Sequence, residues 1–345
     1  MLTRFPLALL LRAALYLAIA ALIVSAGAAG MARERVRAIE FSAVASSATT
    51  RLLAKPPPER SASLMFVGDI MLSRAIGRIM EEYDDWAYPF RDVREVTRAA
   101  DLAIGNLEGP ISNRGRNQGS IYSFLADPRA VAGLADAGFD VLTIANNHIW
   151  DYGPDAMRDT FSHLSASGIA AVGGGEDFIS VHEPVLRTIN GIHIAFLGYT
   201  NLIPRSRDAI DASPAIAYLD PAVAAADVAR AKNEADVVVV LLHWGNEYET
   251  RASPAQRDIA HALIDAGAAL VIGHHPHVVQ EVEQYDRGLI AYSLGNFVFD
   301  QNFSEDTRHG LGLRIVIDRT GIASYEILPF VFSHDFQPMT VNSTF

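Results

Sequence analysis

The chain contains no cysteine in its 345 residues, which excludes disulfide bonds and metal sites built on thiolates. It also lacks the G-x-S-x-G elbow of α/β-hydrolases and the Walker A loop of P-loop nucleotide-binding proteins. Positive charge is scarce, since 28 Lys and Arg stand against 40 Asp and Glu, for a net charge of -12. This excess of acidic residues argues against nucleic acid as a partner.

The first 37 residues differ from the rest of the chain. Residues 13–32 carry no formal charge and are rich in Ala, Leu and Ile, which is long enough to span a bilayer. We expect residues 1–37 to be a signal anchor that places the protein at the cell membrane, with a single span and the folded domain on the extracytoplasmic side. The small residues at 25–29 also suit signal-peptide cleavage, so a secreted protein is the alternative. A buried globular helix is a third interpretation.

Residues 38–62 read as a tether. Ser, Thr and Ala dominate this stretch, and three consecutive prolines at 56–58 make a stiff, extended spacer. We therefore expect one folded domain over residues 63–335.

Within that domain, apolar runs typical of strands alternate with helical patterns. The expected helices each have proline at or near the first position, and they cover residues 127–137, 154–167, 221–235 and 254–266. This alternation predicts parallel strands and α/β architecture. Three hairpin signals, around 190–191, 286–288 and 319–321, add antiparallel pairs. The sequence therefore predicts mixed sheets, arranged as a two-sheet sandwich covered by helices.

Polar residues follow five of the apolar runs directly. Strands that end at one edge of a sheet bring such residues together, and α/β proteins build their sites there. The residues concerned are Asp69, Asn106 with Glu108, Asn147 with His148, His243, and finally His275 with His277.

The fifth cluster, His274-His275-Pro276-His277, follows the apolar run 269–273. Alternate residues of an extended segment point the same way, so His275 and His277 can converge on one metal ion. Oxygen and imidazole donors without cysteine suit Mn, Fe, Zn, Mg or Ca. We therefore expect a divalent ion of this kind at the site.

Each polar cluster also has a structural interpretation. Asp69 could form an Asx turn, and Asn147-His148 could be a turn in which the histidine caps a helix. In the functional interpretation Asn147 offers a carbonyl oxygen to a metal, and His148 protonates a leaving group. Glu247 and Tyr248 could orient histidines.

Other polar residues at strand ends have a weaker signal. Asn296 could line the cleft or stabilise a structural turn, and His274 lies outside the H-x-H pair. We place both beside the site, as residues that contact substrate or support metal ligands.

Taken in order, these motifs resemble the CapA family of capsule or poly-γ-glutamate synthesis proteins. The resemblance covers residues 64–300 and rests on the following stretches: Gly68-Asp69-Ile70-Met71-Leu72, Asn106-Leu107-Glu108-Gly109-Pro110, Asn146-Asn147-His148 with Asp151-Tyr152-Gly153, His243-Trp244-Gly245 with Glu247-Tyr248, His275-Pro276-His277, and Ser293-Leu294-Gly295-Asn296-Phe297. That family is similar to the calcineurin-like metallophosphatases. The resemblance thus implies an α/β/β/α sandwich around a two-metal cleft.

The same resemblance assigns roles to individual residues. It implies that metal ions are bound by Asp69, Asn106, Glu108, Asn147, His243, His275 and His277. It implies a proton donor at His148, and we group Asp151 with it as catalytic. Two positions depart from the metallophosphatase pattern, because Met71 stands in place of a histidine and Asn106 in place of a bridging aspartate. A single-metal site is therefore an alternative to a two-metal site.

We expect a membrane-tethered protein of the cell envelope that serves the synthesis or export of capsule or a poly-γ-glutamate-type anionic polymer. Its metal site would act as a hydrolase on a phosphoester or an amide bond. Expected partners are the membrane, the anionic polymer or a capsule precursor, and subunits of a membrane synthase. One alternative is a non-catalytic accessory subunit that binds polymer, and another is a metal-dependent phosphoesterase.

Overall fold

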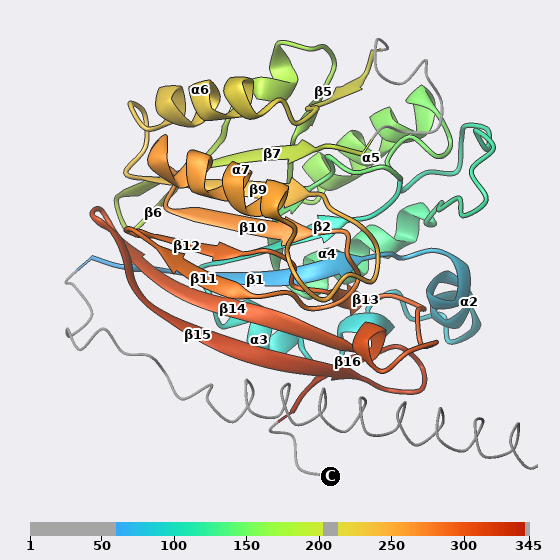
Figure 1. The fold of residues 1–345 in the computed structure, drawn as a ribbon. Helices are drawn as coiled ribbons and strands as arrows, with labels where there is room; N and C mark the ends of the chain where they lie inside the picture. Colours follow the sequence, from blue (N-terminus) through green and yellow to red (C-terminus); the bar gives the residue numbers. More distant parts are fainter. Residues whose placement is uncertain (1–59, 203–212, 342–345) are drawn as a thin grey trace, which may run out of the picture. The chain divides into compact units, whose positions relative to one another are not determined.

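An eight-stranded sheet forms one half of the protein in the computed structural model, which describes residues 60–202 and 213–341. Its order is β16-β15-β14-β1-β2-β3-β4, with β13 beside β1 (Figure 1). β1 pairs in parallel with β2 and β13 but antiparallel with β14, so the sheet is mixed, as predicted. The strands are β1 (Ala62–Ile70), β2 (Leu102–Leu107), β3 (Phe139–Thr143), β4 (Ala170–Val172), β13 (Asn296–Val298), β14 (His309–Asp318), β15 (Gly321–Phe332) and β16 (Pro338–Thr340).

A six-stranded sheet forms the other half, in the order β11-β12-β10-β9-β7-β6. Its centre is parallel, and hairpins add antiparallel strands at both edges. The strands are β6 (Val185–Ile189), β7 (Ile192–Thr200), β9 (Val237–His243), β10 (Leu270–His274), β11 (Val282–Tyr285) and β12 (Gly288–Ala291), and a separate short pair is β5 (Gly174–Gly175) with β8 (Ala215–Ile216).

Helices cover the outer face of each sheet. One buried cluster joins the first sheet to α2 through α5, and another joins the second sheet to α6 and α7. In Figure 1, α7 lies over β9 and β10. The helices are α2 (Arg74–Glu82), α3 (Arg94–Arg98), α4 (Val131–Asp136), α5 (Pro154–Ala166), α6 (Pro221–Ala231) and α7 (Pro254–Asp265), with 3-10 turns at Tyr88–Phe90, Pro128–Ala130, Ser180–His182 and Asp306–Arg308.

The side-chain alternation of the strands builds the sandwich. In β9, Val239 and Leu241 face a core between the two sheets, whereas Val240 faces α6 and α7. Leu64 and Phe66 of β1 enter the same inner core from the opposite sheet. Strands that are apolar on both faces are expected where both faces are covered. The predicted α/β/β/α sandwich is therefore confirmed.

The local signals set most of the turns and helix starts. Asn190 and Gly191 have φ of 51° and 77°, which is the backbone of a type I′ hairpin turn. Ser253 caps α7 by accepting a bond from the backbone N–H of Gln256, in a capping box. Asp220 caps α6 by accepting bonds from two N–H groups of its first turn.

Two predicted helices are shorter in the structure. The pattern at 127–137 becomes a 3-10 turn followed by α4, and the helix expected over 221–235 ends at Ala231. In the second case Asn233 and Glu234 donate to carbonyls three residues back, so the chain tightens before it enters β9.

β1 begins at Ala62, one residue before the expected start of the domain, and β16 lies beyond its expected end at residue 335. The expected anchor at 1–37 and most of the expected tether lie outside the described residues. Among the residues that the structure describes, no helix is long and apolar enough to cross a membrane.

Candidate metal centre and catalytic site

The strand register brings polar residues together at one edge of the sandwich. In the first sheet Asp69 pairs with Asn106 of β2 and with Asn296 of β13. In the second sheet His243 of β9 pairs with His274 of β10. Except for Asn296, which begins β13, these residues stand at or near the carboxyl ends of parallel strands, where open α/β sheets bind ligands.

Direct polar contacts join the two sheets at this edge. Asn106 Nδ2 donates to Asp69 Oδ1 at 2.8 Å and lies 3.2 Å from His243 Nδ1. The other ring nitrogen of His243, Nε2, lies 2.8 Å from Asn147 Oδ1. The backbone N–H of His275 donates to Asp69 Oδ2 at 3.2 Å. The predicted convergence of these strand ends on one site is therefore confirmed.

The histidine loop after β10 has an unusual backbone. His275 and His277 have φ of 96° and 58°, a left-handed conformation that costs a non-glycine residue about 1–3 kcal/mol. The ring of His277 enters the carboxylate cluster, with Nδ1 at 3.2 Å from Asp69 Oδ2 and Nε2 at 3.6 Å from Glu108 Oε1. Its Nδ1 also lies 3.1 Å from Asn296 Oδ1. The strained backbone therefore aims His277 into the cluster.

Several donor atoms in the cluster are buried without a hydrogen-bond partner among the described residues. They include both carboxylate oxygens of Glu108 and the Nδ1 atom of His275, on residues that are 2% and 5% exposed. Buried polar atoms almost always have partners, so these atoms indicate a missing ligand. Two sets of donor atoms, each within 4.8 Å of one another, could hold a cation, namely Asp69 with Glu108 and His243, and Glu247 with His275 and His277.

Burial sets the ionisation of the imidazoles in a way that suits a cation. Burial and the charges of nearby histidines hold the pKa of His243 well below its usual value. Burial also lowers the pKa of His275 to about 3. Both rings are therefore neutral near pH 7 and have a lone pair free for a metal.

The pKa values of Glu108 and His277 are raised, in contrast with those of His243 and His275. Burial raises the pKa of the Glu108 carboxyl well above its usual value, and the charge of Asp69 adds to this effect. Burial alone would lower the pKa of His277, but the charges of Glu108 and Asp69 outweigh it and raise that pKa to about 9. In the absence of another cation, a proton on His277 thus offsets negative charge in the cluster.

His148 is held at the rim of the same cluster. Its Nδ1 lies 2.7 Å from Asp151 Oδ2, and its Nε2 faces Glu108 Oε1 at 3.8 Å. The backbone N–H of Phe124 donates to the same Asp151 oxygen, and the Phe124 ring lies 4.1 Å from the imidazole ring. Asn146 stabilises the turn by accepting bonds from backbone N–H groups, so His148 is free of the capping role considered above.

The remaining candidates surround the cluster at different depths. His274 is buried, its Nε2 lies 3.2 Å from the carbonyl of Val67 in β1, and its Nδ1 has no hydrogen-bond partner among the described residues. It belongs to neither set of possible metal donors. Asn296 contacts His277 and also donates to the carbonyl of Thr307, so it supports that ring. Tyr248 is half-exposed, and burial together with the charge of Glu247 raises its pKa to about 12.

Three supporting residues were missed by the sequence analysis. Asn146 donates to Asn106 Oδ1 at 3.1 Å and to a carbonyl of β2. Phe124 covers His148, and Thr200 donates to the carbonyl of His243. Only Asn146 had a signal, because it adjoins Asn147, whereas the other two reach the site through contacts distant in sequence.

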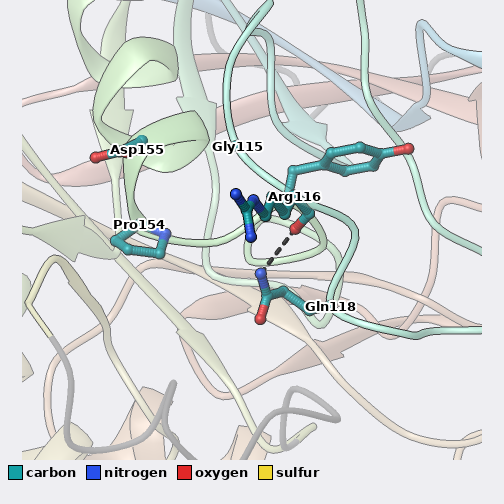
Figure 2. Close-up of a pocket in the computed structure, with 6 residues that line it drawn as sticks. Gly115, Arg116, Gln118, Pro154 and Asp155 are labelled. Atoms are coloured by element: carbon teal, nitrogen blue, oxygen red, sulfur yellow. Dashed lines mark hydrogen bonds between the residues drawn. The ribbon is translucent and has the colours of Figure 1, made fainter.

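A shallow surface pocket adjoins the loop that carries Asp151. Figure 2 shows Arg116 and Gln118 on one side of it, with Pro154 and Asp155 at the start of α5 on the other. Gln118 donates from its side chain to the carbonyl of Arg116, and its backbone N–H donates to the carbonyl of Asp151. The loop that carries Gln118 is therefore bonded to the segment that carries Asp151.

A family model described as bacterial capsule synthesis protein matches residues 63–301, which include every strand end of this site. The chain belongs to this family. The resemblance to capsule and poly-γ-glutamate synthesis proteins is thereby confirmed.

Two Bacillus members of the capsule synthesis family are similar over most of the chain. The capsule biosynthesis protein CapA of Bacillus anthracis is 35% identical over 276 residues, which cover 77% of this chain and 66% of that protein. The PGA biosynthesis protein CapA of Bacillus subtilis is 34% identical over 282 residues, which cover 81% and 73%. Among solved structures, a hypothetical protein from Thermus thermophilus has the same fold, with a TM-score of 0.50, 17% identity, and coverage of 78% of this chain and 99% of that one.

Met71, which stands in place of a histidine of the metallophosphatase pattern, is occupied by contacts of its own. The Met71 side chain is buried, and its sulfur accepts bonds from the hydroxyl and the backbone N–H of Ser73. Asn106, the other departure, uses its amide to bridge Asp69 and His243. Glu108 is the buried carboxylate that lies beside these positions.

Proposed function

We propose that this protein serves the synthesis or export of a capsule or poly-γ-glutamate-type anionic polymer, as a membrane-tethered, envelope-facing protein with a divalent-metal, hydrolase-like site. The observation that carries the metal proposal is the set of buried, unpartnered donor atoms on Glu108 and His275 beside Asp69 and His243. Family membership and the names of the Bacillus relatives support the polymer context. The uncharged run at 13–32 supports the tether.

The donor set fits one or two divalent ions among Mn, Fe, Zn, Mg and Ca. Asp69, Glu108, Asn147 and the imidazoles of His243, His275 and His277 would hold them, with Asn106 as a bridge between ligands. Bound there, such ions would polarise the scissile group and activate water. The low pKa values of His243 and His275 keep these rings ready to bind near neutral pH.

His148 has the geometry of a general acid. Asp151 accepts a hydrogen bond from Nδ1, which fixes the ring and leaves Nε2 facing the cluster. In its imidazolium form the ring would donate the Nε2 proton to the leaving group of a phosphoester or a γ-glutamyl amide. Phe124 covers the ring on one face and restricts its motion.

The test uses full-length protein purified in detergent. Metal content is measured by mass spectrometry, and turnover is measured on a phosphodiester and on poly-γ-glutamate, for wild type and the His275→Ala/His277→Ala variant. The proposal requires bound metal in wild type and a sharply lower metal content in the double variant, with turnover of at least one substrate by wild type. His274→Ala is the matched control, because this ring contacts a β1 carbonyl and should leave metal content unchanged.

A specific observation supports a second function, that of a non-catalytic accessory subunit. Met71 and Asn106 replace a metal ligand and a bridging carboxylate of the metallophosphatase pattern, and the Met71 sulfur faces Ser73. In that case the metal would be bound, but neither substrate would turn over. Polymer production in cells would then be unaffected by His148→Ala.

A further inference from the structure

The loop after β9 brings a carboxylate to the histidine loop. Glu247 offers an oxygen within 4.8 Å of donor atoms of His275 and His277, which form a set separate from that of Asp69, Glu108 and His243. Donors that bind one ion at about 2.1 Å lie about 3–4 Å from each other, so this set needs only a small adjustment. The spacing of the donor atoms in the second set therefore suits a cation of its own.

An independent feature points to a ligand at the same place. His275 is buried, yet its Nδ1 has no hydrogen-bond partner among the described residues. The facing group, Glu247, is exposed at the surface. A buried ring nitrogen without a partner, on a residue of this set, is a position that a cation would fill.

The backbone fixes the Glu247 loop against the histidine loop. The N–H of Tyr248 donates to the carbonyl of Pro276, the residue between the two histidines, at 2.8 Å. Tyr248 has a left-handed φ of 65°, and its ring lies 6.3 Å from the ring of His277. The two loops thus meet as one unit.

Charge explains why this set needs a carboxylate. His275 and His277 bind a metal as neutral rings, so by themselves they would leave a divalent cation uncompensated in a buried place. Asp69 and Glu108 belong to the other set, and Met71 contributes no ligand because its sulfur faces Ser73. Glu247 is the acidic residue of this second set.

We infer that Glu247 is a direct metal ligand that completes a second metal position with His275 and His277 on the solvent-facing side of the cluster. The inference rests on the proposed metal centre and adds to it the ligand that makes the site binuclear. Because Glu247 is exposed, this second ion keeps coordination positions open to water or substrate.

The experiment is a titration of metal-free, full-length protein with Mn²⁺ by calorimetry, followed by metal analysis after dialysis. Glu247→Ala removes the proposed ligand, and Glu249→Ala, an exposed glutamate two residues along the same loop, is the matched control. We expect two equivalents of Mn²⁺ in wild type and in Glu249→Ala. Glu247→Ala should retain one equivalent, with affinity for the other reduced by more than about 100-fold.

A further variant identifies which ion is lost. His243→Ala disrupts the first set, so Glu247→Ala/His243→Ala should bind no Mn²⁺, whereas each single variant keeps one equivalent. A cooperative thermal transition in EDTA shows that each variant is folded. If Glu247→Ala disturbs the fold, Glu247→Gln, which keeps the side-chain size, replaces it and is judged by the same stoichiometry.

The outcomes separate this inference from the proposed function. Two equivalents in Glu247→Ala, with affinity reduced by about 10–100-fold or not at all, would mean that Glu247 only orients a ligand, and the inference fails. A single equivalent in both wild type and Glu247→Ala would also overturn it, while the proposed metal centre stands. Wild type without bound Mn²⁺ would overturn both.

Discussion

Replacing Glu108 with methionine should stabilise the metal-free protein and abolish metal binding by the set of Asp69, Glu108 and His243. Both Glu108 oxygens are buried without a hydrogen-bond partner among the described residues, and the side chain is at the centre of the donor cluster. Methionine has a similar size and makes no hydrogen-bonding demand. The neighbouring histidines keep other carboxylates, because His277 retains Asp69 and His148 retains Asp151.

The size of the effect follows from the missing partners. A buried polar group left without a hydrogen bond costs about 1–3 kcal/mol, and Glu108→Met removes that cost. For a domain of this size class, each kcal/mol shifts the melting temperature by about 2–4 °C. We therefore expect the melting temperature of Glu108→Met in EDTA to be at least about 2 °C above that of wild type.

The pH dependence of this gain has a defined sign. The folded pKa of Glu108 is raised above its ordinary value of 4.5, so the folded state retains a proton that the unfolded state has lost. The stability of metal-free wild type therefore falls as pH rises from 4.5 through the folded pKa. The advantage of Glu108→Met should grow over the same range.

The assay is thermal unfolding followed by circular dichroism, in EDTA and in excess Mn²⁺. Wild type should melt higher in Mn²⁺ than in EDTA, whereas Glu108→Met should show a smaller difference or none. Glu82→Met, at the exposed end of α2, is the control and should change stability by less than about 0.5 kcal/mol. A Glu108→Met protein that melts lower than wild type in EDTA would refute the reasoning, because it would show that the carboxylate stabilises the fold without metal.

Three further predictions follow from the site. His148→Ala should slow turnover by about 10²–10⁴-fold while metal content stays unchanged, and loss of metal would instead make His148 a ligand. In EDTA, the stability that His277 contributes is fully present below pH 6.5 and is lost as pH rises through about 9. Urea midpoints should therefore fall more steeply over this range in wild type than in His277→Gln, and parallel midpoints would contradict the raised pKa of His277. Deletion of residues 1–60, upstream of β1, should leave a soluble protein with a cooperative melting transition, and a broad transition would place part of the domain upstream.

The periodic parts of the fold were predictable because their signals are local. Strands such as Val237–His243 are continuous apolar runs, and the Asn190-Gly191 turn has the residues that a type I′ hairpin needs. The meeting of Asp69 with His243 was also predictable, since parallel strands end at one edge.

Other features depend on contacts between distant parts of the chain. β13 is three residues long and is placed by pairing with β1, where a Cβ on Gly68 would lie 1.9 Å from the carbonyl oxygen of Gly295. The support that Phe124 gives to His148 likewise joins two loops far apart in sequence. The sequence around Gly68 and Phe124 does not predict these contacts, because they form only when the two sheets pack together.

The most direct test of the metal centre is anomalous diffraction from crystals of the protein grown with Mn²⁺. We predict a strong anomalous peak within about 2.0–2.4 Å of oxygen or nitrogen donors of Asp69, Glu108 and His243. Anomalous density confined to surface carboxylates, with the oxygens of Glu108 contacting only water, would contradict it.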